Sequence, residues 1–215
     1  MKIKVCGMRD KENIESLIAL KPDFMGFIFY NKSKRLVTDF PKVKIPSTIK
    51  KVGVFVNETI EEVLNFVEKY QLDCIQLHGD ESPEYCKKLL NSHLERSRKI
   101  NSDYVKLGII KAFSVDENFD FNTTKLYKNC CNYFLLDTKG NDYGGNGIKF
   151  NWEILQKYKG NIPFLLSGGI SAKDVNEIKK INHPQLIGVD VNSGFEIKLA
   201  LKDIEKLKEF KSNLL

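Results

Sequence analysis

The stretch Phe24-Met-Gly-Phe-Ile-Phe29 (FMGFIF) decides the fold class. Its six residues are all apolar or glycine, and such an unbroken run is typical of a parallel strand that is buried on both faces. Similar runs of strand length recur on both sides of it along the chain, each followed by a stretch with helical spacing. Strands that alternate with helices indicate a parallel α/β fold.

Counting these runs predicts eight strands and eight helical segments. We expect the strands at Ile3–Gly7, Phe24–Phe29, Val52–Val56, Cys74–Gly79, Ile109–Val115, Phe134–Thr138, Phe164–Gly169 and Leu186–Val191. We expect the helices at Lys11–Leu20, Asp39–Val43, Asn57–Tyr70, Ser82–Leu90, Thr123–Cys130, Trp152–Tyr158, Ser171–Lys180 and Asp203–Phe210. The polar segment Asn91–Lys106 has no clear period, so we interpret it as an inserted surface loop.

Eight is the number of strands that closes a barrel. The chain of 215 residues suits a single compact (β/α)8 TIM barrel over residues 1–215, because the second and fifth helices are short. An open doubly wound sheet is the alternative. It is disfavoured because the first strand–helix turn, CGMRDK, lacks the glycine-rich dinucleotide fingerprint.

Composition sets the broad class of the protein. Hydrophobic residues make up 42% and charged residues 29% of the chain, and no run approaches the roughly 18 apolar residues of a membrane span. The first residues alternate like a strand and lack the apolar core of a signal peptide, so we expect a cytoplasmic protein. Five cysteines without a C-x-x-C pair and three scattered histidines predict neither a disulfide framework nor a metal site. We expect four of the cysteines, Cys74, Cys86, Cys130 and Cys131, to be small buried apolar residues.

The net charge of +6 is unevenly distributed. Residues 32–51 carry seven Lys or Arg against one Asp, whereas residues 52–90 carry three Lys against eight acidic residues. Such a run is either a solvated face or a basic rim that steers an anionic ligand. Nucleic acid is a less favoured partner, because aromatic residues are not interleaved with the basic ones.

A second informative stretch is Tyr133–Gly147 (YFLLDTKGNDYGGNG). An apolar strand leads to a carboxylate at Asp137, and a glycine-rich loop follows. A charge at the end of a buried strand is costly unless it is used or paired, and glycines allow the backbone to approach a ligand closely. The stretch is therefore either an active-site edge or a strand followed by a polar surface turn. If it is an edge, the loop is a candidate for a mobile cover.

In a barrel, active sites lie at the C-terminal ends of the strands. Alternation along the strands sends Cys6, His78 and Asp190 toward the interior at this end. Cys6 shares a face with Lys4, whose charge would lower the pKa of the thiol and favour a role as a base. Inert packing of this cysteine is the alternative.

A role of Asp137 as a proton donor would require a shift of its pKa in the opposite direction, upward. A low-dielectric pocket would raise the pKa of its carboxyl group, so that it could donate a proton. A base and an acid facing one substrate suggest proton shuttling, as in an isomerase. The alternative is a structural ion pair of Asp137 with Lys4 or Lys111.

Two glycine-containing segments resemble a phosphate cradle. They are Ser167-Gly168-Gly169, before the helix capped by Ser171, and Asn192-Ser193-Gly194, after the eighth strand. Loops after the seventh and eighth strands of such barrels often bind phosphate through backbone N–H groups.

These residues lie in strings that resemble the phosphoribosylanthranilate isomerase family of tryptophan biosynthesis. Seven strings occur in the family's order: KVCGMRD (4–10), SKRLV (33–37), VGVFVN (52–57), QLHGDE (76–81), LLDTKG…GGNGIKFNW (135–152), LSGGI (166–170) and VDVNSGFE (189–196). The chain departs from the family at Asn151, where an acid is expected, at Ser167, where alanine is commoner, and in the longer Asn91–Lys106 segment. The first two departures are peripheral to the chemistry, and the insertion is expected on the bottom of the barrel, remote from the site.

The resemblance implies a cofactor-independent Amadori rearrangement of N-(5-phosphoribosyl)anthranilate, with neither a metal nor an organic cofactor. By this resemblance Asp137 is the general acid that opens the sugar ring, and Cys6 is the base that removes the C2 proton. Arg35 corresponds to the residue that binds the substrate carboxylate. The phosphate site corresponds to Gly168, Gly169, Ser193 and Gly194, and further substrate contacts correspond to His78, Asp190 and Gly145.

The expected partner is a small phosphosugar, with no nucleic acid or membrane. A monomer is the default expectation and a homodimer the alternative. Two rival functions are a two-aspartate phosphosugar isomerase, like that of histidine biosynthesis, and a catalytically silent phosphate-binding barrel. Cys6 argues against the first rival, and the joint presence of Cys6, Asp137 and Arg35 argues against the second.

Overall fold

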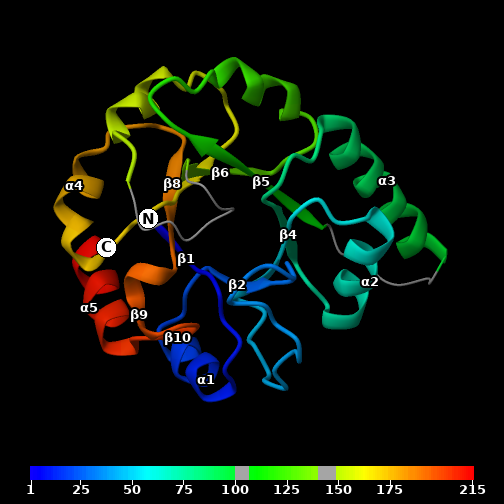
Figure 1. The fold of residues 1–215 in the computed structure, drawn as a ribbon, viewed down its shortest axis with the longest axis horizontal. Helices are drawn as coiled ribbons and strands as arrows, with labels where there is room; N and C mark the ends of the chain where they lie inside the picture. The colour runs from blue at the N-terminus through cyan, green and yellow to red at the C-terminus, as the bar shows by residue number, and fades with distance from the viewer. Residues whose placement is uncertain (100–106, 140–148) are drawn as a thin grey trace.

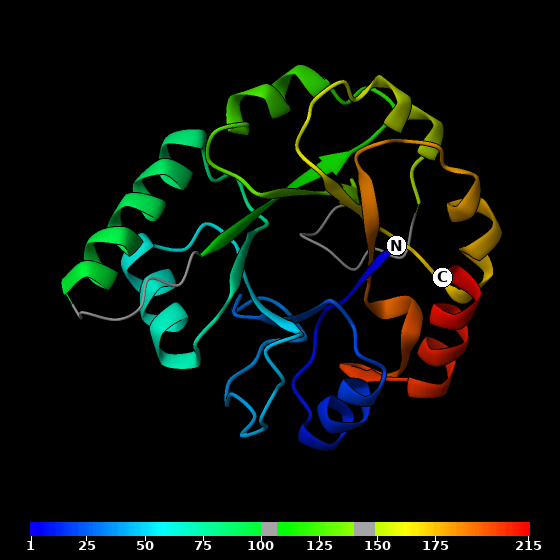
Figure 2. The same cartoon turned by 180° about the vertical axis from the view of Figure 1, so that it is seen from behind.

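The computed structural model describes residues 1–99, 107–139 and 149–215. Eight parallel strands form a closed barrel in sequence order, and β1 pairs with β8 to complete it. In Figures 1 and 2 the strands occupy the centre and the helices lie around them. The strands are β1 (Lys2–Val5), β2 (Phe24–Ile28), β3 (Lys50–Phe55), β4 (Cys74–Leu77), β5 (Gly108–Val115), β6 (Tyr133–Thr138), β7 (Phe164–Leu166) and β8 (Leu186–Val191). The predicted (β/α)8 barrel is confirmed.

The outer layer combines five α-helices with shorter 3-10 turns among the described residues. The α-helices are α1 (Lys11–Ala19), α2 (Ile60–Tyr70), α3 (Pro83–Lys99), α4 (Val175–Lys180) and α5 (Ile204–Leu214). The 3-10 helices are η1 (Phe121–Tyr127), η2 (Trp152–Lys157), η3 (Ala172–Asp174) and η4 (Ser193–Phe195). The predicted helices after the fifth and sixth strands are thus single 3-10 segments, and the seventh combines η3 with α4.

Helix starts follow the capping chemistry of the sequence. Thr59 accepts a hydrogen bond from the backbone N–H of Glu62 at the start of α2, and the Ser82 hydroxyl accepts one from Tyr85 at the start of α3. Ser171 and Asp174 form a capping box at η3. The predicted caps at Ser82 and Ser171 are confirmed.

The helix predicted at Asp39–Val43 is wrong. This segment has a bend at Asp39 and then no regular secondary structure, and the ring of Phe40 stacks on Tyr70 of α2 with centroids 4.3 Å apart. Pro41 explains the difference, because proline lacks an N–H and disfavours the helical conformation of the preceding residue.

The prediction of a loop from Asn91 is also wrong, because α3 continues to Lys99. Arg96 of α3 donates a hydrogen bond of 3.0 Å to Asn65 of α2, which ties the extra turns to the neighbouring helix. This part of α3 is largely polar, so it carries no wide apolar stripe from which a helical period could be read. Residues 100–106 of the predicted insertion lie outside the described ranges.

Side chains sort to the two faces of the barrel wall as alternation predicts. The barrel interior contains Phe24, Val52, Cys74, Ile110, Ala112, Leu135 and Leu165. Ile3 and Val5 of β1 face the helices, and Lys4 between them is fully buried inside. All five cysteines are free and buried, as expected for the four assigned to packing.

A short hairpin after η4 was not expected from the sequence. Strands β9 (Glu196–Lys198) and β10 (Leu201–Lys202) pair in antiparallel fashion, and they lie close to α1 in Figure 1. The Asn13 side chain of α1 exchanges two hydrogen bonds, of 2.8 and 2.7 Å, with the backbone of Lys202. The hairpin therefore places Lys202 at a fixed position beside the barrel. No helix in the described ranges is long and apolar enough to cross a membrane.

Candidate active site

One pocket opens at the C-terminal ends of the strands, which we call the mouth of the barrel. Nine of the ten predicted site residues line it together: Cys6, Arg35, His78, Asp137, Gly168, Gly169, Asp190, Ser193 and Gly194. They come from β1, β2, β4, β6, β7 and β8 or from the connections that follow these strands. The tenth, Gly145, lies outside the described residues, as does the whole of the predicted cover at residues 140–147.

Cys6 lies directly after β1, where its N–H donates a 2.9 Å hydrogen bond to Val191 of β8. Burial raises the pKa of its thiol above the ordinary value, and the ammonium groups of Lys4 and Lys202 offset only part of this. Lys4 does lower the thiol pKa, as expected, but the larger effect of burial leaves the pKa raised overall. The sequence places the cation correctly, but the depth of the cysteine decides the sign.

Lys4 and Asp190 form a buried ion pair next to Cys6. The two residues are opposite each other in the β1–β8 register, and Lys4 Nζ lies 2.8 Å from Asp190 Oδ1. Burial alone would lower the pKa of Lys4, but the charges of Asp190 and Cys6 raise it above its ordinary value. Lys4 is thus a permanent cation at the floor of the mouth.

Asp137 pairs with His78, and with neither of the two lysines considered from the sequence. Asp137 Oδ2 lies 3.2 Å from His78 Nε2, and its Oδ1 accepts a 3.0 Å hydrogen bond from the N–H of Thr138. Lys4 is occupied by Asp190. Lys111 lies on the outer face of β5, between the inward residues Ile110 and Ala112, so the barrel wall separates it from Asp137.

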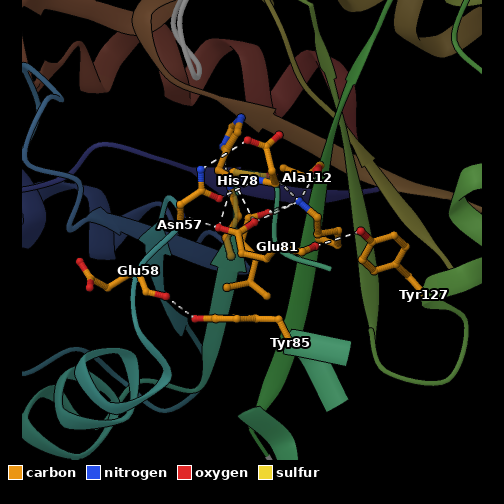
Figure 3. Close-up of polar contacts among 12 residues, drawn as sticks. Asn57, Glu58, His78, Glu81, Tyr85, Ala112 and Tyr127 are labelled. Carbon is orange, nitrogen blue, oxygen red and sulfur yellow. Dashed lines mark hydrogen bonds and ion pairs between the residues drawn. The ribbon is translucent and has the colours of Figure 1, made fainter. Parts of the chain in front are cut away.

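The loop that carries His78 is fixed from behind by a buried network (Figure 3). Glu81 accepts hydrogen bonds from the N–H groups of Asn57 (2.8 Å) and Gly79 (3.0 Å), and its carboxylate lies 3.1 Å from Lys111 Nζ. Lys111 also donates to the carbonyl of Gly79 at 2.7 Å. Neither Glu81 nor Lys111 has a side chain more than 4% exposed. The network therefore holds the turn after β4 without presenting a charge to the pocket.

Arg35 is held by a carboxylate of the unexpected hairpin. Its Nε and Nη2 donate two hydrogen bonds of 2.7 Å to the two oxygens of Glu196, a bidentate arrangement. Glu196 also lies 2.7 Å from the buried Lys202 Nζ. Burial would raise the pKa of Glu196, but the hydrogen bonds from Arg35 and Lys202 lower it to about 2. Two cations and one carboxylate leave this corner of the pocket with a net positive charge.

The two glycine segments meet at one side of the mouth. Gly168 and Gly169 have φ of +92° and +63°, which glycine adopts readily. A Cβ on Gly168 would lie 2.1 Å from the Thr138 hydroxyl, and a Cβ on Gly194 would lie 2.2 Å from the Ile170 carbonyl. The backbone of the two segments is therefore too closely packed to accept side chains at these glycines, and residues of both segments line the pocket.

A group of three thiols lies outside the pocket. The sulfur atoms of Cys86, Cys130 and Cys131 are within 4.8 Å of one another, and all three residues are buried. Thiolates at such separations are able to bind a thiophilic metal ion. Cys130 and Cys131 are adjacent in the chain, but Cys86 lies more than forty residues before them and no C-x-x-C spacing occurs, so the pattern of cysteines did not predict this group.

The residues that hold the site from behind, and the apolar part of its lining, were not predicted from the sequence. Tyr30, Val54 and Val56 line the pocket, and only their positions at strand ends could have indicated this. Glu196 and Lys202 reach the site because of the β9–β10 hairpin. The strands of this hairpin are short and partly polar, so the sequence pattern did not predict them. The basic segment 32–51 does not lie wholly at one end of the barrel. Ser33 and Arg35, in its first part, line the pocket at the mouth, whereas Lys50 and Lys51 begin β3 at the opposite end.

Comparison with known proteins adds independent information. Residues 3–213 match the family described as N-(5'phosphoribosyl)anthranilate (PRA) isomerase. The N-(5'-phosphoribosyl)anthranilate isomerase of Parabacteroides distasonis is 45% identical over 220 residues, which cover 100% of this chain and 94% of the relative.

Solved structures agree with the sequence relatives. Phosphoribosyl anthranilate isomerase from Thermotoga maritima is 32% identical with a TM-score of 0.82, over 100% of this chain and 98% of that one. A phosphoribosyl anthranilate isomerase in complex with reduced 1-(o-carboxyphenylamino)-1-deoxyribulose 5-phosphate is 31% identical with a TM-score of 0.78, again over 100% and 98%. The chain therefore belongs to the N-(5'phosphoribosyl)anthranilate (PRA) isomerase family.

Proposed function

We propose that this protein isomerises N-(5-phosphoribosyl)anthranilate to 1-(2-carboxyphenylamino)-1-deoxyribulose 5-phosphate, a step of tryptophan biosynthesis. The observation that carries the proposal is the convergence of Cys6 and Asp137, from opposite parts of the chain, on one pocket with two glycine segments beside them. An aldose–ketose rearrangement needs an acid and a base that face the same sugar.

In the proposed reaction Asp137 donates a proton to the ring oxygen of the sugar. The ring opens to a Schiff base, and Cys6 then removes the proton from C2. The resulting enolamine tautomerises to the ketone. The pairing of Asp137 with His78 supports the assignment, because it keeps the carboxyl group in one orientation at the mouth.

Cys6 acts as a base only when its thiol is ionised. Burial opposes ionisation, so the two buried ammonium groups of Lys4 and Lys202 have a direct role in the proposed chemistry. They stabilise the thiolate through their charges without themselves giving up protons. Loss of either cation should therefore affect proton abstraction more than substrate binding.

The charged groups of the substrate have separate proposed sites. Gly168, Gly169, Ser193 and Gly194 bind the phosphate through backbone N–H groups. Arg35 binds the anthranilate carboxylate, and Asp190 and Gly145 contact the rest of the substrate. Glu196 occupies two nitrogen atoms of Arg35, so the carboxylate would bind through the remaining Nη1 edge or by displacing Glu196.

The decisive experiment is turnover of phosphoribosylanthranilate, followed by the loss of its fluorescence. We expect turnover without added metal or cofactor, and no turnover of the phosphosugar substrate of the histidine-pathway isomerase. A folded protein without activity on phosphoribosylanthranilate would contradict the proposal. Cys6→Ala and Asp137→Asn should each lower kcat by about 10²–10⁴-fold, because each removes a proton-transfer group.

Arg35→Ala tests the carboxylate site, and we expect it to raise KM. Unchanged kcat and KM would exclude Arg35 from substrate binding. We further propose that the chain acts in the cytoplasm as one domain of residues 1–215. The T. maritima relative is described as dimeric, so sedimentation velocity should distinguish a monomer from a homodimer here.

A further inference from the structure

Gln76 is buried beneath His78 and bonds to the side of the imidazole ring that faces away from Asp137. Its Nε2 lies 2.8 Å from His78 Nδ1, and His78 Nε2 lies 3.2 Å from Asp137 Oδ2. The three side chains therefore form one hydrogen-bonded row from the barrel interior to the mouth. All three line the pocket.

The orientation of the amide decides which ring nitrogen carries a proton. An amide NH2 group is only a donor, so Nδ1 accepts from Gln76 and the ring proton lies on Nε2. In that arrangement Asp137 accepts from Nε2–H and from the N–H of Thr138. Both of its oxygens are acceptors, which suits a carboxylate and not a proton donor.

The other end of the amide has no partner. Gln76 Oε1 is buried and makes no hydrogen bond within the described residues. Gln76 is 1% exposed, so water cannot readily satisfy this oxygen from the bulk. A half turn of the amide would break only the bond to His78 and would replace it with one from Nδ1–H to Oε1.

We propose that Gln76 is a positioning residue that controls how many protons the His78–Asp137 pair holds, by presenting either its NH2 group or its oxygen to Nδ1. With NH2 toward the ring, the pair holds one proton, on Nε2, and Asp137 is a carboxylate. With the oxygen toward the ring, the pair holds two protons: one on Nδ1, and one shared between Nε2 and Oδ2. The second state contains one more proton, taken from solvent.

The two-proton state is the form that can act as an acid. Asp137 gives the shared proton to the substrate, and the pair then keeps a single proton on Nδ1. Nε2 now faces the carboxylate without a proton between them, so the pair readily takes up the next proton. This inference rests on the proposed role of Asp137 as the acid, but the states of the pair are defined without substrate.

Other charges near the pair are fixed or lie behind the wall. Asp190 of β8 interacts electrostatically with both Asp137 and His78, and it is itself paired with Lys4 of β1. Cys6 adjoins this pair, and burial raises the pKa of its thiol. Lys111 and Glu81 compensate each other on the outer face. Gln76 thus differs from these groups in making its side-chain hydrogen bond to the ring alone.

The test is ¹⁵N NMR of the imidazole nitrogens in the ligand-free protein, which distinguishes the two neutral tautomers from the doubly protonated ring. The chain has only three histidines, so His93→Gln and His183→Gln assign the His78 signals without touching the pocket. In the wild type we expect the Nε2–H tautomer at high pH and uptake of one proton, appearing on Nδ1, as the pH falls.

Gln76→Glu presents only acceptor oxygens to His78 Nδ1. The midpoint pH at which Nδ1 takes up its proton should therefore rise by about one pH unit or more. Gln76→Met removes both the NH2 donor and the oxygen acceptor while keeping a side chain of similar size. The Nδ1 proton should then appear at a midpoint about one pH unit below that of the wild type. Midpoints that stay at the wild-type value in both variants would overturn the proposal. If Gln76→Met does not fold, the proposal is tested by the midpoint of Gln76→Glu and by the tautomer of the wild type. A wild-type His78 with its proton on Nδ1 at high pH would also overturn the proposal.

Kinetics separate this role from a structural one. The alkaline fall of kcat should follow the His78 midpoint in each variant, with KM changed less than kcat. Turnover with unshifted NMR midpoints would reject the role of Gln76 while leaving the proposed function intact. Shifted midpoints in a protein without turnover would reject the function while leaving the inference intact.

Discussion

The buried Glu81–Lys111 pair gives a stability prediction whose size follows from the structure. Lys111→Met removes the ammonium group and leaves the Glu81 carboxylate, 1% exposed, with only its backbone donors. Breaking a buried ion pair by removing one partner typically costs about 3–5 kcal/mol. We expect a loss near the lower limit, about 3 kcal/mol, because the N–H groups of Asn57 and Gly79 still compensate part of the charge.

Urea unfolding at neutral pH, followed by far-UV circular dichroism and by the fluorescence of the single tryptophan, measures this loss. The matched control is Lys2→Met, which breaks a 3.3 Å pair with Asp23 whose side chains are 46% and 37% exposed. Such exposed pairs contribute about 0–1 kcal/mol.

The double variant Glu81→Gln with Lys111→Met removes both charges, and it should be more stable than the sum of the single losses predicts. A coupling of about 1–3 kcal/mol is expected for groups in direct contact. A loss for Lys111→Met no larger than that for Lys2→Met, or additive losses in the double variant, would refute the reasoning that Glu81 is a compensated buried charge.

Three further predictions concern the pocket. The pKa of Glu196 is lowered to about 2 in the folded protein. Its ion pairs therefore stabilise the fold fully at pH values above the ordinary glutamate pKa of about 4.3, and this stabilisation is lost as the pH falls toward 2. Thermal unfolding should therefore show Glu196→Gln less stable than wild type at pH 7, with the gap closing between about pH 4 and pH 2; a constant gap would contradict this. Because burial raises the pKa of Cys6, iodoacetamide should modify it at pH 7 more slowly than a free thiol, and more slowly still in Lys4→Met, as measured by mass spectrometry of the Cys6 peptide. Gly194→Ala should weaken competitive inhibition by inorganic phosphate at least about tenfold while Gly160→Ala does not, since only the first places a methyl group between the two phosphate-binding segments.

The parts of the fold that follow from local pattern were predictable from the sequence. Most strands contain an apolar run between turn residues, and an unbroken apolar run of this length is typical of a parallel strand buried on both faces. The helices with a wide apolar stripe, such as α2, were also predictable. Asp39–Val43 and the end of α3 were not, because tertiary contacts decided them: Phe40 stacks on Tyr70, and Arg96 bonds to α2.

The sequence by itself determined which of the candidate acid and base residues meet at the mouth. Strand order and alternation bring Cys6, Asp137 and Asp190 to one end of the barrel, because the C-terminal ends of parallel strands share an edge. Only the tertiary structure decided their electrostatic states and partners. Burial depth sets the sign of the Cys6 pKa shift, and the wall between Lys111 and Asp137 leaves Asp137 to His78. Such effects depend on distances through space and on the loss of solvent, and neither can be read from positions along the chain.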